Sequence, residues 1–298
     1  MNFSQLKTFV TVVEAGSFSD AARLLGISQP AVTMQVQSLE TDVGATLLDR
    51  RYRKVDLTEA GRALLPHARR ILIQLESAKE DIVALSGIIT GRLTIAASTT
   101  PGVYVVPRLL GSFLAAYPEV GVRILVHDTA EVVAMVEANE AQIGVTGGTV
   151  RGARVNYQES GSDELVLICP KGHALAGKRN VALADLANET WIMRESGSGT
   201  RQVAEKILTE HGLDVGELRV AVELGTGEAI VSAVEGGLGV SMLSRHVAEK
   251  AIALGSVAQI DAEGLPVSRP LYLVMPKGTP TRAAVAFNEY LDAALKRD

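Results

Sequence analysis

Amide and hydroxyl side chains recur on one face of a short helix that the sequence predicts from residue 28 to residue 40. These side chains are Gln29, Thr33, Gln35 and Gln37. The opposite face is apolar and carries Val32, Val36 and Leu39. Gln and Thr both donate and accept hydrogen bonds, so they suit the base edges exposed in the major groove of DNA. The chemistry indicated by this face is base recognition.

A second short helix is predicted to position the first. Ser19 is expected to cap it, and Gly26 to end it. Ile27 is expected to be a buried plug, and Ser28 to cap the following helix, whose first turn contains Pro30. Two helices joined by a tight glycine turn describe a helix-turn-helix. An ordinary helical hairpin with solvated glutamines is the alternative.

The residues that follow predict a small β-wing. Val55 and Leu57 indicate its second strand, and Arg51, Arg53 and Lys54 lie at or near its tip. Residues 1–58 contain equal numbers of basic and acidic side chains, but most of the cations fall within residues 50–54, where they could anchor a duplex through phosphate contacts. The rest of the chain carries the net charge of −5 and is not expected to bind DNA.

This N-terminal block closely resembles the LysR-type transcriptional regulators. The matching pieces include Leu6–Phe9, Gly16–Phe18, Ala21–Ala22, Ser28–Thr33, Leu39–Glu40, Gly44, Leu47, Arg50 and Leu57–Gly61. The resemblance implies an N-terminal winged helix-turn-helix and double-stranded DNA as a partner. It assigns DNA contacts to Ser28, Gln29, Pro30, Thr33, Met34, Gln35, Gln37, Arg51, Arg53 and Lys54. Met34, Gln35 and Gln37 stand where the family often has Arg or Lys.

A long helix is predicted from Thr58 to about Leu85. Its apolar residues alternate steps of four and three: Leu64, Ala68, Ile71, Leu75, Ala78, Ile82 and Leu85. Such a heptad seam is typical of a two-stranded coiled coil and favours a homodimer. The alternative is a helix packed only on its own domain, whose apolar stripe would be broader. By resemblance, the assembly is expected to be a homotetramer.

Short apolar strands alternate with helices from residue 92 onward, which predicts an α/β fold. The resemblance implies two α/β lobes joined by two crossings, like a periplasmic solute-binding protein. We expect a DNA-binding domain at 1–58, a dimerisation helix at 59–88 and an effector-binding domain at 92–298. Within it, lobe I comprises about 92–161 and 267–298, and lobe II about 162–266.

Three corners rich in Gly, Ser and Thr follow predicted strands, where ligands of α/β folds gather. Thr226 opens another helix nearby. Together with it, the candidate effector-binding residues of these corners are Ser98, Thr99, Thr100, Thr146, Gly147, Glu195, Ser196, Gly197, Ser198, Thr200 and Arg201. The third corner, from Glu195 to Arg201, has the ingredients of an anion site. It most resembles the regulators of sulfur assimilation and carbon fixation. Ordinary helix caps are the alternative for any single corner.

An enzyme and a transport receptor are the rival interpretations. Cys169 and His173 are four residues apart, but Cys169 ends an apolar strand and no third orienting group is evident. The five histidines lack metal-ligand spacing, and neither a cofactor nor a metal is expected. No long apolar run or N-terminal leader is evident, which predicts a cytoplasmic protein without membrane contact. We therefore expect a transcriptional regulator that responds to a small anionic or polar effector bound between the two lobes, with a solute-binding protein as the alternative.

Overall fold

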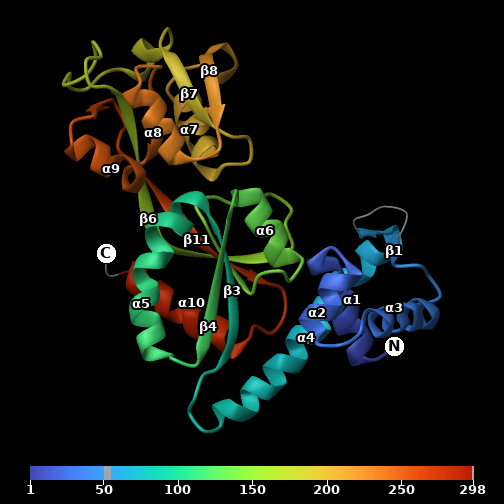
Figure 1. The fold of residues 1–298 in the computed structure, drawn as a ribbon. Coiled ribbons are helices and arrows are strands. Elements are labelled where there is room, and N and C mark those ends of the chain that lie inside the picture. Colours follow the sequence, from blue (N-terminus) through green and yellow to red (C-terminus); the bar gives the residue numbers. More distant parts are fainter. Residues whose placement is uncertain (50–54, 297–298) are drawn as a thin grey trace. The chain divides into compact units, whose positions relative to one another are not determined.

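The computed structural model describes residues 1–49 and 55–296, which fall into two compact units. The first comprises Met1–Ile88 with Ala138–Glu140, and the second the remainder of the chain. The first begins with three helices, α1 (Phe3–Ala15), α2 (Phe18–Leu25) and α3 (Gln29–Val43) (Figure 1). Phe9, Val32, Val36 and Leu39 are fully buried between them. The predicted helix-turn-helix is therefore α2 and α3, braced by α1.

Local hydrogen bonds define the turn between α2 and α3. Ser17, two residues before the expected Ser19, caps α2 by accepting from the Asp20 amide. Gly26 takes the left-handed conformation, with φ of 67°, and ends that helix. The prediction that Ile27 is a buried plug was wrong, because its side chain is 38% exposed. The Ile27 amide instead donates to the Ala22 carbonyl, so a backbone hydrogen bond fixes the turn.

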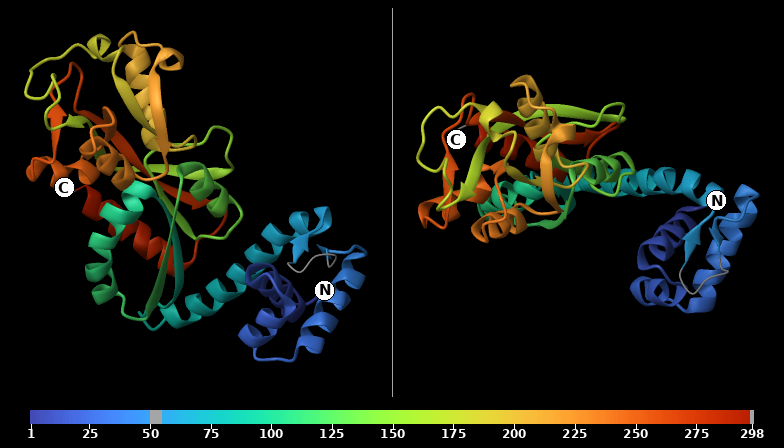
Figure 2. Two further views of the ribbon diagram at one scale, coloured as in Figure 1. Left: turned by 45° about the horizontal axis from the view of Figure 1, so that its top comes forward. Right: turned by 90° about the horizontal axis from the view of Figure 1, so that it is seen from above.

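The wing is a two-stranded antiparallel ribbon of β1 (Leu48–Asp49) and β2 (Asp56–Leu57). Thr58 then caps α4 (Glu59–Ala84). Pro66 lies within α4, and Figure 2 shows this helix continuing without a break. The candidate DNA contacts Arg51, Arg53 and Lys54 lie outside the described residues.

The predicted heptad seam of α4 divides into two parts. Leu64 and Ala68 pack into the core of the N-terminal unit, with Ala68 fully buried. These two positions therefore support the alternative of packing on the helix's own domain. Beyond them, the seam's large side chains are exposed: Ile71 by 44%, Leu75 by 38%, Ile82 by 70% and Leu85 by 88%. An unpaired apolar stripe thus begins at Ile71.

The first lobe of the second unit has a parallel core of β3 (Gly91–Ser98), β4 (Val120–His127) and β5 (Ile143–Thr146). A π-helical turn (Pro101–Val105) leads into α5 (Val106–Ala116). Together with α10 (Arg282–Leu295), α5 covers one face of this sheet through Phe113 and Phe287. The other face is covered by α6 (Thr129–Glu137). These elements agree with the predicted alternation of strands and helices.

Two long antiparallel strands, β6 (Val155–Pro170) and β11 (Val267–Pro276), run through both lobes (Figure 1). In lobe I, β11 pairs with β5. In lobe II, β6 pairs with β9 (Ser241–Ser244) and β10 (Val257–Ile260). The sequence predicted only the second half of β6 and missed β10. The order β10-β6-β11-β5-β3-β4 makes these strands one sheet, with β9 also paired to β6.

Lobe II is completed by a parallel pair, β7 (Thr190–Arg194) and β8 (Arg219–Leu224), and three helices. These are α7 (Gly199–Glu210), α8 (Gly227–Glu235) and α9 (Arg245–Ala253). Two short 3₁₀ helices lie at Leu183–Leu186 and Val215–Glu217. Trp191 is fully buried in this lobe. None of the helices in the described part of the chain is long and apolar enough to cross a membrane.

Candidate functional site

The exposed face of α3 presents most of the predicted DNA contacts. Ser28, Gln29, Pro30, Met34 and Gln37 are exposed, and Thr33 is half-buried. The Ser28 side chain caps the helix by accepting from the Ala31 amide at 3.3 Å. The Thr33 hydroxyl donates to the Gln29 carbonyl at 3.1 Å, which leaves its oxygen as an acceptor. This face can therefore offer both donors and acceptors to base edges.

Gln35 differs from its neighbours because α1 holds its side chain. Its Oε1 accepts hydrogen bonds from the Thr8 hydroxyl and, at 3.4 Å, from the Ser4 hydroxyl. These bonds occupy the acceptor end of the amide. The Nε2 group remains as a donor, so Gln35 is fixed in one orientation.

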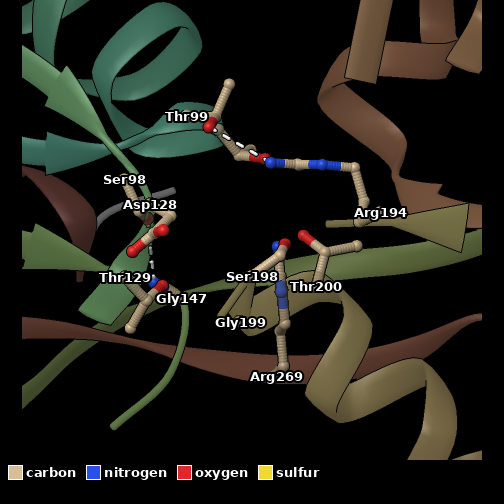
Figure 3. A pocket seen from close by; sticks show the side chains of 11 residues that line it. Ser98, Thr99, Asp128, Thr129, Gly147, Arg194, Ser198, Gly199, Thr200 and Arg269 are labelled. Atoms are coloured by element: carbon tan, nitrogen blue, oxygen red, sulfur yellow. Dashed lines mark hydrogen bonds between the residues drawn. The ribbon is translucent and has the colours of Figure 1, made fainter. Parts of the chain in front are cut away.

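A small polar cavity lies between the two lobes (Figure 3). Its volume is about 10 Å³. A cavity needs roughly 10–15 Å³ to hold one water, so this one is no larger than a single water site. Lobe I and the crossing strand β11 supply most of one wall, and β7 and the start of α7 supply the other. The lining residues are Ser98, Thr99, Thr100, Asp128, Thr129, Gly147, Arg194, Ser198, Gly199, Thr200 and Arg269.

Arg269 supplies a buried positive charge to the cavity. Its Nε and Nη2 donate to Asp163 Oδ2 at 3.0 and 2.7 Å. Its Nη1 is buried and has no hydrogen-bond partner among the described residues. A Cβ added to Gly147 would lie 3.1 Å from the guanidinium carbon of Arg269 and 3.2 Å from Nη1. The glycine therefore gives this unpartnered donor room at the cavity wall.

Arg194 links the lobes across the same cavity. Its Nη2 donates to Thr99 Oγ1 at 3.2 Å, as Figure 3 shows, and to the Gly225 carbonyl at 3.3 Å. Glu195 accepts from Arg194 Nε at 2.7 Å and from Nη2 at 2.6 Å. The Thr99 bond joins a loop of lobe I to a strand of lobe II.

The start of α7 adds partial positive charge. Ser198 is the N-cap of this helix, but its side chain makes no capping hydrogen bond. The first amides of α7 are thus open to an acceptor, and the helix dipole favours an anion there. Asp128 is the one carboxylate of the lining, and its Oδ1 is occupied by the Glu131 amide at 2.7 Å. Two guanidiniums, hydroxyls and a helix start therefore suit a small anion.

The structure brings six of the predicted effector residues to this cavity: Ser98, Thr99, Thr100, Gly147, Ser198 and Thr200. The other six do not line it: Thr146, Glu195, Ser196, Gly197, Arg201 and Thr226. The predicted anion partner Arg201 instead pairs with Glu205 and Glu223, and it donates to the Arg194 carbonyl at 3.0 Å. Its hydrogen bond to Glu223, followed by that of the Ser196 amide, lowers the pKa of Glu223.

The remaining residues outside the lining have local structural partners. Glu195 holds Arg194. The exposed Ser196 donates through its amide to Glu223. Thr146 is fully buried and donates to the Gly148 carbonyl. Gly197 has φ of 96° and lies against the Asp128 carboxylate. Thr226 caps α8.

The sequence analysis missed five lining residues: Asp128, Thr129, Gly199, Arg194 and Arg269. Asp128 and Thr129 follow β4 directly and could have been found by the rule that identified the other corners. Gly199 lies inside the predicted third corner. Arg194 ends β7 and directly precedes the predicted third corner, so the same rule could have found it. Arg269 gave no such signal, because it lies within β11 and meets Asp163, a partner distant in the sequence.

Cys169 lacks the environment of an activated nucleophile. It is fully buried, and burial, followed by the charge of Glu189, raises its pKa to about 11. His173 pairs with Glu189 at 3.2 Å. Within residues 1–49 and 55–296, no group of three or more His, Cys, Asp or Glu side chains could hold a metal ion.

Two family models together match most of the chain. Residues 3–62 match the bacterial regulatory helix-turn-helix protein, lysR family, and residues 86–296 match the LysR substrate binding domain. The chain is similar to a RuBisCO operon transcriptional regulator from Allochromatium vinosum. The two are 36% identical over 292 residues, which cover 98% of this chain and 95% of that protein.

Two solved structures are also similar. The CcmR regulatory domain of Synechocystis PCC6803, in complex with 2-PG, is 34% identical with a TM-score of 0.64, covering 70% of this chain and 98% of that one. Full-length CbnR complexed with its target DNA is 28% identical with a TM-score of 0.68, covering 99% of this chain and 100% of that one. The predicted fold class is confirmed. The chain belongs to the LysR family of DNA-binding transcriptional regulators, with an N-terminal helix-turn-helix and a two-lobed effector-binding domain.

Proposed function

We propose that this regulator senses a small anion in the cavity between its lobes and passes the signal to DNA-bound α3. One observation carries the choice of an anion: the buried Nη1 of Arg269 at the cavity wall has no partner among the described residues. A buried guanidinium nitrogen without an acceptor is costly, and a ligand oxygen would supply the missing hydrogen bond. The start of α7 and the hydroxyls of Ser98, Thr99 and Thr200 would complete the site.

The ligand closing this site is compact. The cavity has room for about one water at most, so a phosphoryl, sulfate or carboxylate group would have to part the lobes slightly. The related CcmR domain binds 2-PG, which supports a small ligand in this kind of domain. Because the bond between Thr99 and Arg194 joins the lobes, a ligand that takes over either partner would change their closure.

Isothermal titration of the full-length protein with phosphate, sulfate, sulfite, short carboxylates and 2-PG tests the proposal. At least one should bind, and T99A should weaken that binding about tenfold, the effect of losing a hydrogen bond to a charged group. Ser112→Ala, which removes an exposed hydroxyl of α5, should leave the affinity unchanged. Absence of binding for every anion, or equal loss in both variants, would contradict it.

DNA recognition is assigned to the exposed face of α3. In the proposal, Gln29, Pro30, Thr33, Gln35 and Gln37 face the major groove, with Met34 beside them. Ser28, Arg51, Arg53 and Lys54 contact the backbone or minor groove. Fluorescence anisotropy on the chain's own upstream DNA, compared with scrambled DNA, should show a preference that Gln35→Ala with Arg51→Ala abolishes. Failure to bind any duplex at low salt would contradict the assignment of DNA recognition to this face.

The proposed assembly places two copies side by side through residues 59–88. Support comes from the exposed stripe that starts at Ile71. Dimers would present two copies of α3 to two half-sites, and a homotetramer would let lobe closure change the angle between DNA-binding pairs. Acting on DNA, the protein would work in the cytoplasm and without catalysis. Residues 1–58 would bind DNA, and residues 92–298 the effector.

A further inference from the structure

Asp128 places a carboxylate in the wall of a cavity that otherwise suits an anion. It lies between the end of β4 and the start of α6 and lines the cavity from lobe I, whereas Arg194 lines it from lobe II (Figure 3). Its Oδ1 accepts from the Glu131 amide at 2.7 Å, which fixes the orientation of the carboxylate. Within the described residues, its Oδ2 accepts no hydrogen bond. The wall therefore holds one oriented acceptor that has no donor.

The contact with Gly197 shows which way this free oxygen faces. A Cβ added to Gly197 would lie 3.3 Å from Asp128 Oδ2 and 3.7 Å from Oδ1. Gly197 belongs to the loop between β7 and α7 in lobe II, so Oδ2 is the oxygen turned toward the opposite lobe. A group held between the lobes can therefore reach it.

The charges around the cavity leave Asp128 without a cationic partner. Arg194 is paired with Glu195, and Arg269 is paired with Asp163. Neither of these two carboxylates lines the cavity, but each balances the charge of its own arginine. In the described part of the chain, Asp128 forms no ion pair. Together these five side chains carry three negative charges and two positive ones.

A ligand that is only an anion would satisfy half of this site. The buried Nη1 of Arg269 lacks an acceptor, and the first amides of α7 favour negative charge. The same ligand would be repelled by Asp128 and would leave Oδ2 cut off from water without a hydrogen bond, which is costly. A donor on the ligand would turn this repulsion into a charge-assisted hydrogen bond.

We propose that the effector is a small anion with a hydrogen-bond donor on the carbon next to its anionic group, and that Asp128 selects it. The anionic group contacts Arg269 Nη1 and the start of α7, and the donor binds Asp128 Oδ2. The donor is a hydroxyl or an ammonium group, as in a 2-hydroxy or 2-amino acid. The two groups are adjacent because the cavity is no larger than a single water site. This inference rests on the anion site proposed above and specifies the class of its ligand.

Isothermal titration of the full-length protein with acetate, glycolate and glycine tests the selection. The three carboxylates are similar in size and differ in a single group on one carbon, which is hydrogen, hydroxyl or ammonium. Glycolate or glycine should bind about tenfold more tightly than acetate, the effect of one hydrogen bond to a charged group. The tighter of the two identifies the donor that the site takes.

Asp128→Asn should change the affinities in opposite directions. The amide keeps an oxygen for the Glu131 amide and replaces the other oxygen by an NH₂ group, which donates and carries no charge. Acetate should bind more tightly to this variant than to wild type, whereas the preferred ligand should lose about tenfold. Damage to the fold would weaken both. Glu131→Gln is the matched control, because it removes one charge from a side chain that is 60% exposed and lies outside the lining.

Three results would overturn the role of Asp128. These are equal affinities of wild type for all three carboxylates, an equal loss of all three in Asp128→Asn, and the same change of the affinity ratio in Asp128→Asn and Glu131→Gln. Binding of phosphate or sulfate with no binding of glycolate or glycine would also overturn it and would leave the anion site standing. If no anion binds, the anion site fails, and this inference fails with it.

Discussion

Asp163 and Arg269 face each other directly on β6 and β11, where the two crossing strands pair. The Arg269 side chain is 3% exposed and that of Asp163 is fully buried. Asp163 Oδ2 accepts two hydrogen bonds from the guanidinium, while Oδ1 accepts from the Ser244 hydroxyl at 2.7 Å. The pair and Ser244 thus connect three strands, and Arg269 Nη1 is buried without a hydrogen-bond partner among the described residues.

Removing the carboxylate from this pair should destabilise the second unit. Asp163→Ala leaves a buried guanidinium uncompensated, which costs about 3–5 kcal/mol, and Asp163→Asn should cost less because it keeps an acceptor. Glu164→Gln, which breaks the partly exposed bridge to Arg245, should cost at most about 1 kcal/mol. Urea unfolding of the three variants measures these losses of unfolding free energy and checks their order. A similar cost for Asp163→Ala and Glu164→Gln would contradict it.

A single methyl group at Gly147 should weaken anion binding. Its Cβ would lie 3.1 Å from Arg269 Cζ, so the guanidinium must shift away from the position that presents Nη1. We expect an affinity loss of about tenfold for whichever anion binds. Gly111→Ala is the control, because its Cβ meets nothing within 4 Å and it lies inside α5. That variant should keep the affinity and gain about 0.5–1 kcal/mol of stability.

The orientation of Gln35 should contribute to sequence preference. Thr8→Val removes the hydroxyl that fixes Gln35 Oε1 and lets the amide rotate. The ratio of specific to non-specific DNA affinity should fall by about fivefold, less than the loss from a whole bidentate base contact. Thr11→Val removes a hydroxyl that donates only to the Lys7 carbonyl of the same helix, and should leave the ratio unchanged. Anisotropy on specific and scrambled duplexes measures both, and an unchanged ratio in Thr8→Val would refute the role.

The exposed part of α4 should carry dimerisation. Ile82→Lys places a charge in the seam and should shift the dimer toward monomer, because burying one Ile contributes about 1.5–3 kcal/mol. Val83→Lys changes a neighbouring side chain that lies outside the seam and is 40% exposed. The dimer of this variant should dissociate much less. Sedimentation equilibrium distinguishes the two variants. Equal dissociation constants would mean that the seam is not the interface.

Alkaline pH should weaken the contact between the lobes at Tyr104. Burial, then the hydrogen bond to Glu228, raises the pKa of Tyr104 to about 12. Because the pKa is higher in the folded protein, the stabilisation from the protonated Tyr104 is fully present below the pKa of an unfolded tyrosine, about 10, and is lost as pH rises toward 12. Wild type should therefore lose stability over this range relative to Tyr104→Phe, which does not titrate. Parallel declines in urea unfolding series of both proteins would contradict this.

Local patterns accounted for most elements of this fold. Short, mainly apolar or β-branched runs such as Ile143–Thr146 favoured buried strands, and the polar and apolar faces of α3 were evident from spacing alone. The start of β6 escaped detection because residues 155–164 are mostly polar, and because the strand it pairs with, β11, lies more than 100 residues away in sequence. Ile27 was misplaced because hydrophobicity alone says nothing about which way a left-handed turn directs the next side chain.

The candidate site shows the same division between local and distant information. Ser98, Thr100 and Ser198 were found because they directly follow strands or start helices. Arg269 was missed because its role depends on Asp163, which lies 106 residues earlier in the chain. Arg201 was favoured because it follows a glycine-rich corner, yet two neighbouring carboxylates occupy its guanidinium.

The pairing of β6 with β11 also limits what the two lobes can report. Two adjacent strands, hydrogen-bonded to each other across the crossing, act like a hinge with one axis, and the irregular register between Pro270 and Tyr272 gives it a bend point. We therefore expect one lobe to swing toward the other about this axis rather than to slide past it. Chemically different ligands would then differ in how far they close the lobes, and the regulatory output would be graded.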